Sequence, residues 1–242
     1  MLTVQNLQKK FNNHFAVDNV DFSVSSGEIF SLIGPNSSGK TTIVKSITGL
    51  LRIDGGQVTV GGNDVAKNPK EAKSLIGYIP DEPAVWSGMT GEEFLHFVGA
   101  LYGMDPELRR KKIKELLPLY ALDGVEKDQF EQYSRGIKQK FSILAALMHE
   151  PKLIVVDEPI VGLDPESAIV TKKIFHDFAR AGGAILLVTH TLSIAHEIST
   201  RIGVLKKGKL IAVGTFEELK QIGKVGHNAT LEDVYTALTR IM

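Results

Sequence analysis

The residues from Gly34 to Thr42, read GPNSSGKTT, have the spacing G-x-x-x-x-G-K-[ST] of a phosphate-binding loop. Such a loop turns successive backbone N–H groups toward an anion, and the positive end of the helix after it adds to the attraction. Lys40 is then expected to reach the β- and γ-phosphates of a nucleotide, and the Thr41 hydroxyl to ligate Mg²⁺. The loop residues predicted to bind the nucleotide are Gly34, Pro35, Asn36, Ser37, Ser38, Gly39, Lys40, Thr41 and Thr42.

The residues on either side of this loop predict the strand and the helix that the motif requires. Glu28 to Ile33, EIFSLI, is a short apolar run typical of a buried strand, and Thr42 to Leu51 has the pattern of a helix. We therefore interpret the segment as a nucleotide site rather than as a glycine and serine turn without a ligand. Ser37 stands where related loops often carry glycine, and a positive φ at that position would strain it.

Two carboxylates follow a second apolar run. Leu153 to Val156 reads as a buried strand, and Asp157 and Glu158 come directly after it. In an open α/β sheet, ligands bind at the carboxyl ends of the strands, where this pair would meet the phosphate loop. Asp157 is then placed to hold Mg²⁺, directly or through water, and Glu158 to polarise the attacking water. Without the phosphate loop, the same pair would fit an ordinary turn.

His190 ends the next predicted strand, in the sequence Val188-Thr189-His190. A histidine at that edge of the sheet can hydrogen-bond a γ-phosphate and orient the nucleophile. A single histidine is more often a surface or packed residue, so the prediction depends on the loop and the carboxylates. With them, Lys40, Glu158 and His190 form the predicted catalytic set.

The rest of the chain predicts an α/β fold of the P-loop NTPase type, with a mostly parallel sheet, an N-terminal antiparallel β layer and an inserted helical subdomain. Leu2–Leu7 and Val20–Val24 alternate apolar and polar residues, as half-exposed strands do, and Gly55-Gly56 is read as a turn. We expect one domain, with a nucleotide-binding core at 1–82 and 151–215, a helical subdomain at 83–150 and a C-terminal helical tail at 216–242.

The composition excludes several classes of protein. Lys plus Arg and Asp plus Glu each number 28, so the net charge gives no general attraction to nucleic acid or an anionic bilayer. No cysteine is present, which excludes disulfides and thiolate chemistry and suits a reducing compartment. The first residues do not read as a signal peptide, and no apolar run approaches the roughly 18 to 20 residues that span a bilayer. We expect a soluble chain whose membrane role comes through a partner.

The order of these motifs resembles that of the ATP-binding subunits of ABC transporters. The segments GPNSSGKTT, YSRGIKQK, LIVVDEP, GLDP and VTH occur at similar intervals, over essentially the whole chain. Several motifs in a fixed order are more specific than a phosphate loop alone, which many NTPases share. The resemblance implies an ATPase that uses ATP and Mg²⁺.

The resemblance also implies roles that spacing does not show. Tyr133 to Ile137 stands where the family signature reads LSGGQ, and Ser134 and the N–H of Gly136 would there cap the ATP bound by the opposite subunit. Asp164 matches a loop that crosses the dimer interface. Phe11 matches an aromatic residue that stacks on adenine, although a core phenylalanine near a strand end also fits.

Three residues depart from the family pattern. Asp81 stands where the family usually has a glutamine beside the metal, and with Thr41 and Asp157 it completes the predicted metal ligands. Arg135 replaces the first glycine of the signature, and Ile137 replaces its glutamine. A left-handed backbone would penalise Arg135, whereas a guanidinium near a triphosphate is favourable.

As implied by the resemblance, the function is ATP hydrolysis at a head-to-tail homodimer or heterodimer that drives separate integral membrane permease subunits. Export is favoured over import by analogy with bacterial drug and peptide exporters. The chain would lie in the cytoplasm, peripheral on the cytoplasmic face of the cell membrane. Trp86 would anchor the partner or belong to the core.

Two other functions compete. A soluble ABC-type ATPase acting on ribosomes or nucleic acid would usually carry two nucleotide domains or a long coiled-coil insertion, and we expect no nucleic-acid partner. A weakly hydrolysing nucleotide-sensing scaffold is suggested by Asp81 and the altered signature.

Overall fold

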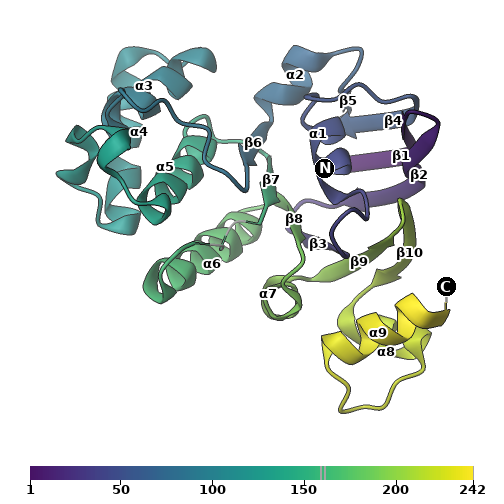
Figure 1. The fold of residues 1–242 in the computed structure, drawn as a ribbon. Helices are drawn as coiled ribbons and strands as arrows, with labels where there is room; N and C mark the ends of the chain where they lie inside the picture. The colour runs from purple at the N-terminus through teal and green to yellow at the C-terminus, as the bar shows by residue number, and fades with distance from the viewer. Residues whose placement is uncertain (159, 161, 242) are drawn as a thin grey trace.

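The computed structural model describes residues 1–241 except 159 and 161, and its elements are arranged around two sheets (Figure 1). One is a four-stranded antiparallel sheet with the strand order β2-β1-β4-β5, as the N-terminal pattern predicts. Its strands are β1 (Leu2–Phe11), β2 (His14–Val24), β4 (Gly55–Val60) and β5 (Asn63–Asp64).

Two details of this sheet differ from the sequence-based prediction. Strands β1 and β2 extend to a tight hairpin at Asn12 and Asn13, whose φ angles of 46° and 65° suit a residue that tolerates the left-handed region. The turn predicted at Gly55-Gly56 is wrong, because both glycines lie in β4. A Cβ on Gly56 would come within 2.2 Å of the carbonyl oxygen of Asn6, so this glycine serves close strand pairing.

The second sheet has the order β10-β9-β3-β8-β7-β6 and is parallel except for the pairing of β9 with β10. Every residue of β3, β7 and β8 is buried, as expected for strands covered on both faces. The strands are β3 (Ile29–Ile33), β6 (Ile76–Ile79), β7 (Leu153–Asp157), β8 (Ala184–Thr189), β9 (Arg201–Lys206) and β10 (Lys209–Gly214).

Helices lie on both faces of this sheet and in a group beyond its β6 end. They are α1 (Lys40–Ile47), α2 (Pro69–Ser74), α3 (Gly91–Leu101), α4 (Pro106–Leu116), α5 (Arg135–Leu147), α6 (Pro165–Arg180), α7 (Leu192–Ile198), α8 (Phe216–Gly223) and α9 (Leu231–Ile241). Helix α1 starts before the predicted Thr42 and ends before Leu51, since the N–H groups of Leu50 and Leu51 both turn back to the carbonyl of Lys45. Within the described part of the chain, no helix combines the length and the apolar character needed to cross a membrane.

Helix α1 lies between the two sheets, where Ile43, Val44 and Ile47 join one apolar core. A second core joins the opposite face of the parallel sheet to α6 and to the helices between β6 and β7, which form the teal group in Figure 1. This packing fixes the phosphate loop at the start of α1 and the strand ends of β6, β7 and β8 at one edge of the sheet.

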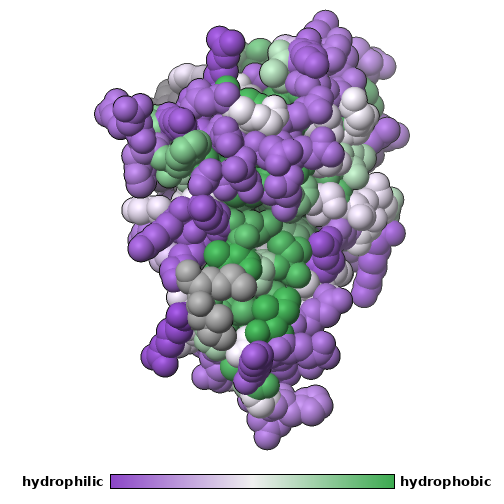
Figure 2. Space-filling view, turned by 90° about the vertical axis from the view of Figure 1, so that its right-hand side faces the viewer, coloured by the Kyte–Doolittle hydropathy of each residue, from purple (hydrophilic) through white to green (hydrophobic). Residues whose placement is uncertain are grey.

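The C-terminal helices dock onto the sheet beside β9. Leu219 of α8 and Leu231, Val234 and Leu238 of α9 are buried against a cluster that includes Val204. Figure 2 views the side of the molecule where this tail lies and shows apolar surface in the lower half of that face. The tail therefore docks onto the core.

Candidate active site

The phosphate loop has a backbone that few residue types tolerate. Gly39 has φ 109°, and a Cβ there would come within 2.4 Å of the carbonyl oxygen of Ala16 in β2. At Gly34, a Cβ would meet the carbonyl oxygen of Leu205 in β9 at the same distance. Ser37 has φ 66°, so the strain that the sequence suggested is present, at about 1 to 2 kcal/mol for a non-glycine residue.

Unused hydrogen-bond donors converge on this loop. Helix α1 has Gly39 at its N-cap, no side-chain cap and no acidic residue in its first turn. The first backbone N–H groups of a helix have no partner within it, and here they belong to the cavity-lining residues Lys40, Thr41 and Thr42. The Ser38 hydroxyl oxygen is buried without a hydrogen-bond partner in the described part of the chain. A loop with these free donors fits a bound triphosphate.

Lys40 is folded onto its own loop. Its Nζ donates hydrogen bonds to the carbonyl oxygens of Gly34 at 2.8 Å and Pro35 at 3.0 Å. Burial lowers the pKa of Lys40, while the charges of Glu158 and Asp157 act in the opposite direction. The ammonium is therefore held beside the place where phosphate would lie, with two carboxylates nearby.

One cavity of ≈ 610 Å³ joins the predicted site residues from distant parts of the chain. Phe11 and Ala16 come from the β1–β2 hairpin, and Asp81 follows β6. The other lining residues are Asn36, Ser37, Gly39, Lys40, Thr41, Thr42, Asp157, Glu158 and His190. Ala16 was missed from the sequence, where a small residue in a strand gives no signal.

Phe11 is exposed at the rim of this cavity. Its exposed fraction is 48%, so the alternative of a core phenylalanine is wrong. Lys9 Nζ lies 5.4 Å from the centroid of the Phe11 ring, so the ring packs beside a charged side chain of its own strand and not in an apolar core. An exposed aromatic face next to a phosphate loop can stack on a nucleotide base.

Asp157 is one of two buried carboxylates in the site, the other being Glu158. Burial first, and then the charges of Glu158 and Asp81, raise the pKa of Asp157 to about 6, against the opposing effect of Lys40. A carboxylate in such a setting is relieved by a divalent cation, because the cation replaces the missing solvation and offsets the neighbouring negative charges. With the Thr41 hydroxyl and Asp81 in the same cavity, the oxygen donors suit Mg²⁺.

Glu158 is fixed by the end of β8. Its Oε2 accepts from the Thr189 hydroxyl at 2.7 Å, and its Oε1 accepts from the backbone N–H of His190 at 2.7 Å and lies 2.6 Å from His190 Nδ1. Its own backbone has φ 52°, a left-handed conformation. A carboxylate offers about four lone-pair sites, so one stays available for a water molecule. Thr189 was not singled out from the sequence, because a threonine at a strand end is common.

The signature segment lies outside the cavity. Ser134 caps α5, where its hydroxyl accepts from the N–H of Ile137 at 3.3 Å. Asp164 caps α6, and hydrogen bonds from the hydroxyl and N–H of Ser167 lower the pKa of Asp164 to about 2. A Cβ on Gly136 would lie 3.0 Å from the carbonyl oxygen of Gly162, so the two segments are neighbours. Neither Ser134, Gly136 nor Asp164 lines the nucleotide cavity of its own chain.

Two of the unusual residues meet. Arg135 NH2 donates to Oδ1 of Asp81 at 3.2 Å, across 54 positions of sequence. Arg135 is the first residue of α5, so its backbone is right-handed and the penalty considered for a left-handed conformation does not arise.

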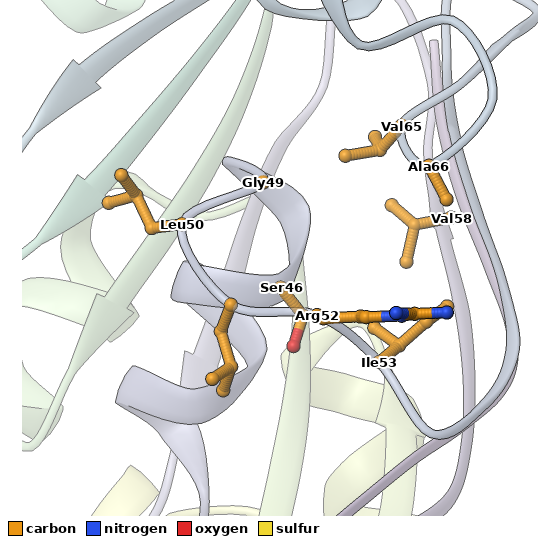
Figure 3. A pocket seen from close by; sticks show the side chains of 9 residues that line it. Ser46, Gly49, Leu50, Arg52, Ile53, Val58, Val65 and Ala66 are labelled. Carbon is orange, nitrogen blue, oxygen red and sulfur yellow. The ribbon is translucent and has the colours of Figure 1, made fainter.

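A smaller cavity of ≈ 320 Å³ lies at the opposite end of α1 (Figure 3). Val58, Val65 and Ile53 form an apolar wall, and the Arg52 side chain extends across it. None of the residues that we predicted for the site lines this space. The predicted catalytic residues Lys40, Glu158 and His190 all line the larger cavity instead.

Comparison with known proteins supports this assignment. A family profile described as "ABC transporter" matches residues 17–161. The linearmycin resistance ATP-binding protein LnrL of Bacillus subtilis (strain 168) is 36% identical over 219 residues, which cover 90% of this chain and 70% of LnrL. The ABC-type transporter ATP-binding protein EcsA of the same strain is 31% identical over 241 residues, which cover 99% of this chain and 97% of EcsA.

Solved structures show the same fold. One described as the structure of the ATP-binding subunit of an ABC transporter superposes with a TM-score of 0.94 at 30% identity, covering 99% of both chains. The dimeric structure of the ATP-binding cassette MJ0796 bound to ADP and Pi shares the fold with a TM-score of 0.81 at 24% identity, covering 89% of this chain and 98% of that one. The profile match spans more than half of the chain, and the cavity has the loop and carboxylates that such a site needs. The chain therefore belongs to the ABC transporter family, as an ATP-binding subunit with ATPase activity.

Proposed function

We propose that this subunit hydrolyses MgATP between two head-to-tail protomers and drives export through separate membrane permeases. The observation that carries the proposal is the division of the predicted site. The loop, the carboxylates and His190 share one cavity, whereas Ser134, Gly136 and Asp164 lie outside it. A second protomer that brings its own signature segment to this cavity would complete the site.

The first half of the site acts within one chain. The loop N–H groups and Lys40 bind the β- and γ-phosphates, and Phe11 stacks on the base. Thr41, Asp157 and Asp81 would hold Mg²⁺, and the ion would offset the negative charge of the phosphates. Glu158, held by β8, polarises the attacking water through its free lone pair.

His190 is placed by the same carboxylate. With Nδ1–H directed at Glu158, its other ring nitrogen, Nε2, is left to face a γ-phosphate. His190 therefore orients the substrate while it fixes the base.

The second half of the site comes from the partner protomer. Ser134 and Arg135 are exposed at the start of α5, and the first turn of that helix has no acidic residue. An exposed helix N-terminus of this kind binds an anion readily. The γ-phosphate of the opposite protomer fits it, so ATP would hold the dimer together and hydrolysis would release it. The protein MJ0796, which has the same fold, has been solved as a dimer with ADP and Pi.

The surface proposed for the permease lies on the loop after β6 and on the helices that follow. Trp86 is 54% exposed, so the alternative of a core tryptophan is wrong. Its ring packs edge-on against Phe97 at 5.1 Å and is thereby held in place without being covered. A rigid, half-exposed tryptophan is a common anchor at protein interfaces.

Export as the direction of transport rests on the relatives. LnrL is named for linearmycin resistance, and a relative from Streptomyces peucetius, 33% identical, is named for daunorubicin and doxorubicin resistance. For this chain we propose an exported substrate and a position on the cytoplasmic face of the cell membrane. We also propose the division into a core at 1–82 and 151–215, a helical subdomain at 83–150 and a tail at 216–242.

The experiment that tests the proposal is affinity purification of the tagged full chain from gently solubilised membranes of its native cell. We expect a multi-span membrane protein in fixed ratio to the chain. Copurification of ribosomes or nucleic acid instead would contradict the proposal and support the competing class of soluble ABC-type ATPases.

A matched pair of variants localises the partner surface. Trp86→Ala should reduce the yield of the membrane protein about ten-fold or more, as expected for a buried aromatic anchor. Leu108→Ala, on α4 and 47% exposed, removes a similarly exposed apolar side chain and should leave the yield unchanged. Equal yields from the two variants would place the permease elsewhere.

A further inference from the structure

The loop after β6 and the first turn of α5 are joined by one ion pair. Asp81 lines the nucleotide cavity, and its Oδ1 accepts a hydrogen bond from Arg135 NH2 at 3.2 Å. Arg135 also lies along the backbone of Gly162, where a Cβ on that glycine would be 3.4 Å from the Arg135 side chain. The Arg135 side chain, at the start of the signature helix, thus pairs with the loop after β6 and lies close to Gly162 in the segment before α6.

The carboxylate of Asp81 has two candidate partners, a cation in the cavity and the guanidinium of Arg135. Its position in the cavity makes it available to a cation bound beside Thr41 and Asp157. One of its two oxygens, however, is already paired with the guanidinium of Arg135.

We propose that Arg135 is a positioning residue for Asp81. Its guanidinium competes with the metal for the Asp81 carboxylate, and this competition links metal binding in the cavity to the start of the signature helix. The inference rests on the proposed placement of Mg²⁺ beside Asp81. It concerns a single chain and does not require the dimer or the permease.

The direction of the effect follows from charge. When Arg135 is removed, the negative charge of Asp81 beside the cavity is no longer compensated. A divalent cation then binds more tightly, and a triphosphate without metal is repelled. When Asp81 is neutralised, the metal loses one ligand, and Arg135 no longer competes with the metal for a carboxylate. Both side chains are about half exposed, at 53% and 50%, so the effect of the pair is modest.

The quantity to measure is the ratio of two dissociation constants of the isolated chain for a fluorescent nonhydrolysable ATP analogue, with excess EDTA and with saturating Mg²⁺. This ratio reports the metal's share of nucleotide binding and is independent of turnover. Protein concentrations low enough to keep the chain monomeric, as checked by light scattering, remove any contribution from a partner protomer.

We expect Arg135→Ala to raise the ratio about two- to five-fold and Asp81→Asn to lower it, while Arg135→Lys stays near the unmodified chain. The double variant should match Asp81→Asn alone, because Arg135 acts only through Asp81. Glu82→Gln and Lys138→Ala are the controls: each removes a charge next to the pair, has no ion pair among the described residues, and should leave the ratio unchanged.

Three results would overturn the inference. An unchanged ratio in folded Arg135→Ala would show that the guanidinium does not restrain Asp81. Independent, additive effects in the double variant would show that Arg135 acts elsewhere, for example on the triphosphate of a partner protomer. Loss of metal dependence only in Asp157→Asn, with Asp81→Asn unaffected, would instead show that the metal does not use Asp81, without affecting the ATPase assignment.

Discussion

His190 binds Glu158 through two different groups: its backbone N–H donates to Oε1 at 2.7 Å, and Nδ1 lies 2.6 Å from the same oxygen. The hydroxyl of Thr189 holds the other oxygen at 2.7 Å. The end of β8 therefore fixes the carboxylate that follows β7 before any substrate binds, and the orientation of the base is built into the parallel sheet.

Glu158→Gln tests this base. The amide keeps the size of the side chain and an oxygen for the His190 N–H, but it has no negative charge with which to polarise water. We expect ATP turnover to fall by about 10² to 10⁴, the usual contribution of a general base, while ATP still binds. Light scattering should show a dimer that persists with ATP. Fast hydrolysis by the variant would mean that another group activates the water.

The raised pKa of Asp157 predicts that the unfolding free energy of the chain depends on pH. Because the folded chain raises the pKa of Asp157 to about 6 from an ordinary value near 3.8, the charged carboxylate is unfavourable in the fold. This penalty is fully present above pH 6 and disappears as pH falls toward 4. Asp157→Asn should therefore be more stable than the unmodified chain at pH 8, by about 1 to 2 kcal/mol after allowance for solvent screening, and equally stable near pH 4.

Chemical unfolding of the nucleotide-free and metal-free chain at several pH values measures this difference. Added Mg²⁺ and nucleotide should reduce the advantage of Asp157→Asn at pH 8, because they stabilise the charged carboxylate only in the unmodified chain. A difference that is constant between pH 4 and pH 8 would rule out Asp157 as the titrating group.

Gly39 tests the geometry of the phosphate loop. Gly39→Ala places a Cβ 2.4 Å from the Ala16 carbonyl oxygen at φ 109°, so we expect a loss of more than about 2 kcal/mol in unfolding free energy and loss of nucleotide binding. Gly62→Ala is the control for backbone strain alone, since φ is 83° there and no atom lies within 4 Å of the added Cβ. It should cost only about 1 kcal/mol and leave nucleotide binding intact. Equal losses would show that the contact with Ala16 is unimportant.

Phe11 tests base stacking. Phe11→Ala should weaken ATP binding about two- to ten-fold, which corresponds to the 0.5–1.5 kcal/mol of an aromatic contact, and Phe11→Tyr should preserve it. Phe15→Ala, in the same hairpin but away from the cavity, is the matched control. Calorimetric titration with ATP measures all three variants, and a loss shared by Phe15→Ala would indicate a general effect on the hairpin.

The sequence predicts most of the strands and helices because they have strong local patterns. The fully buried strand β7 follows from a run of four apolar residues, and β3 lies within the predicted run Glu28 to Ile33. Gly55 and Gly56 were misread because a glycine that permits close pairing looks the same in sequence as one that permits a turn. Only the position of β1 beside β4 distinguishes them.

Sequence motifs point to Lys40 and Asp157, which the fold brings to one cavity, whereas a contact that depends on tertiary arrangement leaves no such signal. Ala16 enters the cavity through its place in a hairpin, and Thr189 through its distance from Glu158. Arg135 and Asp81 were each noticed as unusual, but 54 positions separate them. Nothing in a single sequence indicates that such residues are partners.

Four neighbouring strands, in the order β3-β8-β7-β6, each carry part of one cavity at the same edge of the sheet. These parts are the phosphate loop, His190, Glu158 and Asp81. These parts are far apart along the chain, so the cavity exists only when the whole sheet has assembled. Nucleotide then binds the complete fold and not a partly folded chain, and at a concentration one hundred times its dissociation constant it adds about 2.7 kcal/mol of stability. In the cell, the ATP supply would thus govern how long the subunit survives proteolysis as well as how fast it works.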